Sequence, residues 1–131
     1  MYIRFTTQFR NETGDHETGV FQAAAYLRRH PDTYHYDVKL LDEIIEWFNI
    51  NLERPTRFSK SRHKNSENVS LSWYKNTAHD HIQKMYDMKA ILEKYDIVVE
   101  AVKRENPGNI IYEDEIQVSA LPFRTDRSKV I

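Results

Sequence analysis

Polar and apolar side chains alternate at the start of the chain. Ile3 and Phe5 fall on one side of residues 2–9, and mainly polar side chains fall on the other. This two-residue period is typical of a β-strand with one buried face. The polar stretch RNETGDHETG that follows contains two glycines and predicts an exposed turn. We expect Thr18 to cap a short helix that ends before Pro31.

A helical period begins at Tyr34. Apolar residues recur there every three or four positions and form one stripe, which consists of Val38, Leu41, Ile45, Phe48 and Leu52. Pro55 should end this helix, because the residue before a proline is disfavoured in the helical conformation. The Ser- and Asn-rich segment that follows has no hydrophobic period of either kind, so it predicts a long loop.

A third helix is expected to begin at Asn68 or Ser70 and to reach about Tyr95. Its apolar positions again recur every three or four residues, and they include Leu71, Tyr74, Ala78, Ile82, Met85 and Leu92. This helix should therefore be long and lie against the core.

Three strands are expected in the C-terminal third. The β-branched residues between Ile97 and Val102 predict the first, and two short strands follow around the acidic turn 113–115. The order of strand, three helices and three strands lacks the strand–helix alternation of a parallel sheet. We therefore predict an α+β, two-layer domain, in which three helices cover one face of a sheet formed by the first strand and a three-stranded antiparallel meander. The expected core includes Leu41, Ile45, Phe48, Ile82, Met85 and Leu92.

The length and composition of the chain fit one compact domain. Its 131 residues are 40% hydrophobic and 30% charged, as in ordinary globular proteins. We expect one globular domain over residues 1–123 and a flexible tail over residues 124–131. No segment has the pattern of a signal peptide or a membrane span, so we expect a cytoplasmic protein without a membrane partner.

Several chemistries are excluded by the residue types. The chain has no cysteine, which excludes disulfides, thiolate nucleophiles and cysteine-ligated metal centres. Glycine-rich nucleotide motifs are absent from the sequence, and we expect no cofactor. His79 and His81 lie two positions apart, about 200° around the axis of the expected helix, so they cannot share one ion. No metal site is expected.

Positive charge is concentrated in the segment 54–64, which we call the basic loop. It carries five lysines and arginines and no acid, although the formal net charge of the chain is -1. Arginine can donate two parallel hydrogen bonds to a phosphate or carboxylate, and a neighbouring serine adds a hydroxyl donor. Trp73 lies off the apolar stripe of the expected third helix, where its ring could stack on a base or line a pocket. The expected ligand-binding residues are Arg57, Ser59, Arg62, Trp73, Lys75 and Tyr112.

His79 is the side chain best suited to move a proton near the basic loop, because an unperturbed imidazole titrates near neutral pH. The alternative, which we favour, is a partly buried, hydrogen-bonded His79 at the edge of the core.

The leading functional hypothesis is a small binding or regulatory domain. Its basic loop and the start of the third helix would engage an anionic partner: a phosphate-bearing ligand, a nucleic acid or an acidic protein surface. A second hypothesis is a small enzyme that acts on a phosphorylated or nucleotide-like substrate, with His79 as general acid or base. A third is a protein that forms a homodimer through its amphipathic helices and binds no small ligand. The basic loop could also be a solvated connection whose charges pair with acids of the preceding helix.

Overall fold

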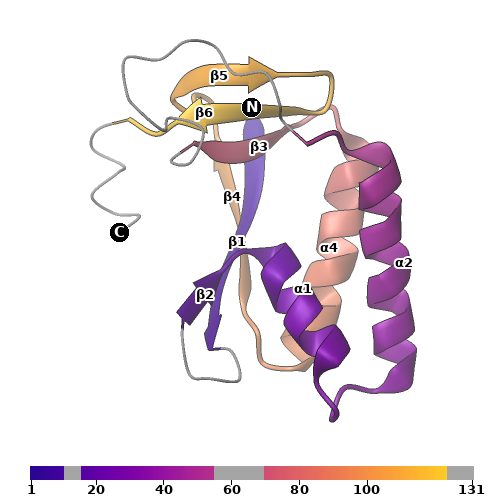
Figure 1. The fold of residues 1–131 in the computed structure, drawn as a ribbon. Helices are drawn as coiled ribbons and strands as arrows, with labels where there is room; N and C mark the ends of the chain where they lie inside the picture. Colours follow the sequence, from indigo (N-terminus) through magenta and orange to yellow (C-terminus); the bar gives the residue numbers. More distant parts are fainter. Residues whose placement is uncertain (11–15, 55–69, 124–131) are drawn as a thin grey trace. The chain divides into compact units, whose positions relative to one another are not determined.

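The computed structural model describes residues 1–10, 16–54 and 70–123, and within these ranges it contains three α-helices and six β-strands (Figure 1). In chain order the elements are β1 (Tyr2–Arg10), β2 (His16–Thr18), α1 (Val20–Arg29), α2 (His35–Asn51), β3 (Leu71–Lys75), α4 (His79–Lys94), β4 (Val99–Arg104), β5 (Asn109–Glu113) and β6 (Gln117–Leu121). The predicted α+β, two-layer class is confirmed, although the order of strands and helices differs in detail. No helix in the described ranges is long and apolar enough to cross a membrane.

The chain forms two compact units. We call the first the sheet unit; it consists of Met1–Arg4, Arg54–His79 and Lys103–Ile131. We call the second the helical unit; it consists of Phe5–Glu53 and Asp80–Val102. One domain over residues 1–123 stays a prediction, and the predicted tail over residues 124–131 lies outside the described residues.

The strands of the sheet unit pair in the order β1–β3–β6–β5, and each of these pairs is antiparallel. The predicted hairpin of β5 and β6 is confirmed. Strand β4 pairs with β1, so it does not extend the hairpin into the three-stranded meander that we predicted. The hydrophobic pattern indicates which face of a strand is buried, but it does not identify the neighbouring strand.

Asp114 builds the turn between β5 and β6. Its carboxylate accepts hydrogen bonds from the backbone N–H groups of Ile116 and Gln117 at 2.8 and 2.9 Å. It also accepts one from the hydroxyl of Tyr112 at 2.8 Å. Burial acts to raise the pKa of Asp114, but these hydrogen bonds together outweigh it and lower the pKa. The acidic turn predicted from the sequence is thus held by one carboxylate that organises the backbone.

Residues 71–75 form strand β3, so the prediction that they begin the third helix was wrong. The apolar residues Leu71, Tyr74 and Ala78 are spaced by three and four positions, which fits a helix as well as a short strand followed by a turn. In the strand, Trp73 and Tyr74 point to opposite faces, and both are buried. Helix α4 begins only at His79.

The start of helix α1 also differs from the prediction. Its N-cap residue is Gly19 and not Thr18. Gly19 has a φ of 110°, which side-chain-bearing residues rarely adopt. The segment predicted as an exposed turn contains strand β2, which pairs antiparallel with the end of β1.

Within the helical unit, helices α1 and α4 pack on the apolar face of β1. The ring centroids of Phe9 and Tyr26 are 5.6 Å apart, and those of Phe5 and Tyr86 are 5.1 Å apart. Helices α2 and α4 run side by side (Figure 1) and are joined by side-chain hydrogen bonds near both ends. These contacts provide the helix-on-sheet packing that the amphipathic pattern predicted.

The core of the helical unit matches the sequence prediction in most positions. Four of the six expected core residues are buried, namely Leu41, Phe48, Met85 and Leu92. Ile45 and Ile82 are only half-buried, and their neighbours Ile44 and His81 take the buried positions. Ile82 was misplaced on α4 because we extended the helical stripe back through residues 71–78, which are not helical.

Asp37 connects helix α2 to the end of α4. The Lys94 ammonium donates to both carboxylate oxygens at 2.9 Å, and the Tyr95 hydroxyl donates to the same carboxylate. The hydrogen bond from Lys94, followed by that from Tyr95, lowers the pKa of Asp37. A carboxylate that is only 1% exposed is therefore kept in its charged form by direct partners.

Candidate functional site

The structure describes some of the predicted ligand-binding residues. Arg57, Ser59 and Arg62 lie outside the described residues. Trp73 and Lys75 are two positions apart on β3, so their side chains share one face of the sheet. Tyr112 of β5 is in register with Ser119 of β6, and Ser119 is in register with Ser72 of β3. Residues in register share one face of the sheet, so Tyr112 lies on the face of Ser72, opposite to that of Trp73.

Arg4 of β1 joins Trp73 on its face of the sheet. The register aligns Ile3 with Tyr74, which brings the next residue of β1 beside Trp73. The guanidinium carbon of Arg4 lies 5.6 Å from the centroid of the Trp73 ring, within the range of a cation–π interaction. The alternating pattern of the first strand already put Arg4 on the polar side, but its partner could not be foreseen while Trp73 was assigned to a helix.

Two hydrogen-bond donors of this pair are buried and unused. Neither Arg4 Nε nor Trp73 Nε1 has a hydrogen-bond partner in the described part of the chain. Trp73 is only 4% exposed, so solvent does not replace the missing acceptor. An unsatisfied buried donor costs about 1–3 kcal/mol and calls for an explanation in a folded protein. We call this pair of residues the Arg4–Trp73 site.

The electrostatic surroundings of the site favour a negative ligand. Burial lowers the pKa of Arg4, and the positive charge of Arg104 lowers it further. A guanidinium that is desolvated beside a second guanidinium gains strongly from an anionic partner. In the same unit, Lys75 already forms an ion pair with Glu113, which compensates its charge.

Of the two histidines of α4, His81 is buried and His79 is exposed. His79 is exposed at the first residue of the helix, so the favoured prediction of a partly buried His79 was wrong. His81 is 7% exposed, with Nε2 2.8 Å from the carbonyl oxygen of Asn51 and its ring 4.7 Å from that of Trp47. A carbonyl oxygen only accepts, so His81 donates from Nε2 and links α4 to α2. A role of His79 as general acid or base stays a prediction.

Within residues 1–10, 16–54 and 70–123, no group of three histidine or acidic side chains is arranged to hold a metal ion. Comparisons with models of protein families, with curated proteins and with solved structures find no match to this chain.

Proposed function

We propose that the chain is a binding protein for phosphate-bearing ligands and that Arg4 and Trp73 hold the phosphate group. The observation that carries this proposal is the pair of buried N–H donors that lack an acceptor in the described residues. Phosphate oxygens accept several hydrogen bonds at once, and those from a guanidinium are strengthened by its charge. A bound phosphate that accepts from these donors would also offset the repulsion between Arg4 and Arg104.

The basic loop favours the same class of ligand. Its five cations lie between residues 54 and 64, and the chain then leads into β3, which carries Trp73. Contacts from lysine and arginine to phosphates make binding weaken as salt concentration rises. The roles of Arg57, Ser59 and Arg62 in this loop stay predictions.

The proposed role of Trp73 differs from the one expected from the sequence. Its ring is almost fully buried and is covered by Arg4, so it is a poor platform for a nucleobase. We assign it the role of a donor through Nε1. We assign Lys75 and Tyr112 no direct contact with the phosphate. Lys75 pairs with Glu113, and Tyr112 lies on the face of the sheet opposite to Trp73.

The test compares Arg4→Lys with Lys103→Gln. Arg4→Lys keeps the positive charge but removes Nε–H and the planar fork, so affinity for phosphate should fall about tenfold or more, the worth of one charged hydrogen bond. Lys103→Gln removes a charge at an exposed position of β4, and at constant ionic strength affinity should change less than about threefold. Titration calorimetry with inorganic pyrophosphate and with a mixed-sequence single-stranded oligonucleotide provides both affinities.

Other outcomes would point to other functions. Equal affinities of wild type and Arg4→Lys would mean that charge alone, and not the buried donors, holds the ligand. Binding of polyaspartate with no binding of either phosphate probe would favour an acidic protein surface as the partner. Turnover of a phosphoester by the wild type but not by an equally stable His79→Gln variant would favour the enzyme. A cytoplasmic location and a homodimer are separate expectations from the sequence.

A further inference from the structure

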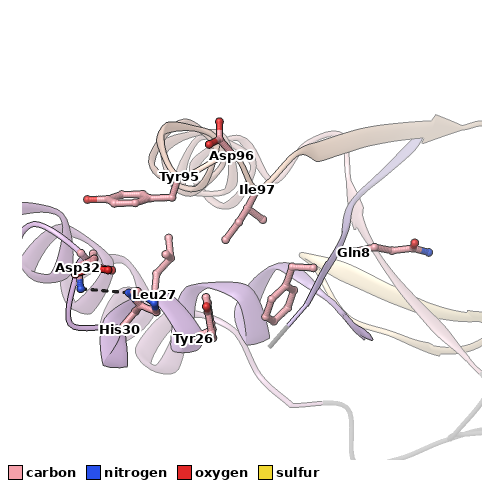
Figure 2. A pocket seen from close by; sticks show the side chains of 10 residues that line it. Gln8, Tyr26, Leu27, His30, Asp32, Tyr95, Asp96 and Ile97 are labelled. Carbon is pink, nitrogen blue, oxygen red and sulfur yellow. Dashed lines mark hydrogen bonds between the residues drawn. The ribbon is translucent and has the colours of Figure 1, made fainter. Parts of the chain in front are cut away.

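The helical unit contains a cavity of about 370 Å³ between α1, the segment after it, and the end of α4 (Figure 2). This volume is within the range of small-molecule pockets, about 300–1,000 Å³. The lining includes Phe9, Tyr26, His30, Asp32, Thr33 and Tyr95. The cavity belongs to a different unit from the Arg4–Trp73 site, so the two inferences stand independently.

Aromatic rings line the cavity from β1, from α1 and from the segments that follow α1 and α4. On the α1 side, the ring of Tyr26 lies 5.6 Å from Phe9 and 5.5 Å from His30, which makes a continuous aromatic surface. Tyr95 directly follows the last residue of α4 (Figure 2). Its hydroxyl donates to Asp37 and accepts the backbone N–H of Tyr34 at 3.1 Å, so its ring is held in place. Rings fixed in this way are suited to contact a flat or apolar ligand.

The lining carries two aspartates, and none of its ten residues is a lysine or an arginine. His30 Nδ1 accepts the backbone N–H of Asp32 at 3.2 Å, so this nitrogen is occupied by the chain itself. Asp32 lies beside His30, whereas Asp96 points away from α1 (Figure 2). Asp32 is therefore the carboxylate available to a ligand in the cavity.

A polar group of the lining also lacks a partner. Thr33 Oγ1 is buried and has no hydrogen-bond partner in the ranges that the structure describes. A hydroxyl of this kind can accept an N–H group, and its burial makes such a bond worth more than at the surface. Thr33 follows Asp32 directly in the chain, and both residues line the cavity.

From these contacts we infer that the cavity binds a small organic ammonium ligand with an aromatic or apolar body. The body packs between the rings of Tyr26 and Tyr95, and the ammonium group meets the carboxylate of Asp32 and the hydroxyl of Thr33. Aromatic faces attract cations, and a carboxylate without a competing lysine or arginine in the lining adds charge complementarity. An anionic ligand would face Asp32 without compensation.

The test uses three probes that share one phenyl ring and differ in charge. They are phenethylamine, its neutral analogue 2-phenylethanol and the anion 3-phenylpropionate. Their affinities for the full chain are measured from chemical-shift changes in nitrogen-15 NMR spectra. The amine should bind about tenfold more tightly than the alcohol, the worth of one charged hydrogen bond, and the anion should bind most weakly.

Two matched variants test the residue assignment. Asp32→Asn keeps the backbone N–H that His30 accepts but removes the charge, so the amine should lose about tenfold in affinity and bind like the alcohol. Asp96→Asn removes a carboxylate that points away from α1 and should change affinity less than about threefold. Equal binding of amine and alcohol to the wild type, the tightest binding by the anion, or no binding of any probe would each overturn the inference, even if a variant failed to fold.

Discussion

Replacing Leu41 by alanine is expected to lower the free energy of unfolding by about 2–5 kcal/mol. Leu41 lies on α2 and is 0% exposed, so its truncation removes buried methyl groups and leaves a cavity that the surrounding side chains only partly fill. Denaturant unfolding followed by circular dichroism measures the change.

Ile45→Ala is the matched control, because it truncates a side chain of similar size on the same helix at a half-buried position. The loss should be clearly smaller than for Leu41→Ala, since less apolar surface is re-exposed. Equal losses at the two positions, or a loss below about 0.5 kcal/mol for Leu41→Ala, would contradict the orientation of α2 in the core.

Asp37→Asn is expected to lower the free energy of unfolding by about 1–3 kcal/mol at neutral pH, the usual worth of hydrogen bonds to a buried charged group. The variant keeps the shape of the side chain but loses the charge that Lys94 and Tyr95 contact. Glu93→Gln is a suitable control, because it removes a more exposed carboxylate that pairs with Lys89, both residues being on α4. Its effect on the free energy of unfolding should be much smaller.

The effect of Asp37→Asn should depend on pH in one direction. The pKa of Asp37 is lowered by folding from its ordinary value of 3.8, so its charge stabilises the native state at pH values above 3.8. This contribution is lost as the pH falls through the lowered pKa of the folded state. The difference in stability between wild type and variant should therefore shrink in acid. A difference that stays constant to about pH 2 would contradict the pairing.

The parts of the fold that could be predicted from the sequence are those with long, regular patterns. Helix α2 extends over four turns or more with a continuous apolar stripe, and strand β1 alternates cleanly, so both were placed correctly. The hairpin of β5 and β6 was signalled by two short apolar runs around acidic turn residues. These signals are local, and they do not depend on distant partners.

Strand β3 could not be predicted because its signal depends on partners that are distant in sequence. Five residues with two adjacent aromatic side chains show neither clear alternation nor a complete helical stripe. The strand is stabilised by pairing with β1 and β6, which lie about 70 and 45 residues away, and a single sequence does not show these pairings.

The candidate site was predicted only in part for the same reason. Trp73 and a positively charged surrounding were expected, but Arg4 was missed because its position beside Trp73 follows from the pairing of β1 with β3. His81 was missed because its burial depends on where α4 begins. The cavity beside Tyr26 and Tyr95 joins residues from both halves of the chain, and no local pattern marks it.

The most direct test of the proposed phosphate site is the indole N–H signal of Trp73 during a titration with pyrophosphate. The chain has two tryptophans, and Trp47 on α2 belongs to the helical unit, so it serves as an internal control once Trp47→Phe has assigned the signals. If phosphate accepts a hydrogen bond from Trp73 Nε1, the Trp73 proton should shift downfield and saturate, while the Trp47 signal stays in place. A Trp73 signal that does not move while pyrophosphate binds elsewhere on the chain would contradict the proposal.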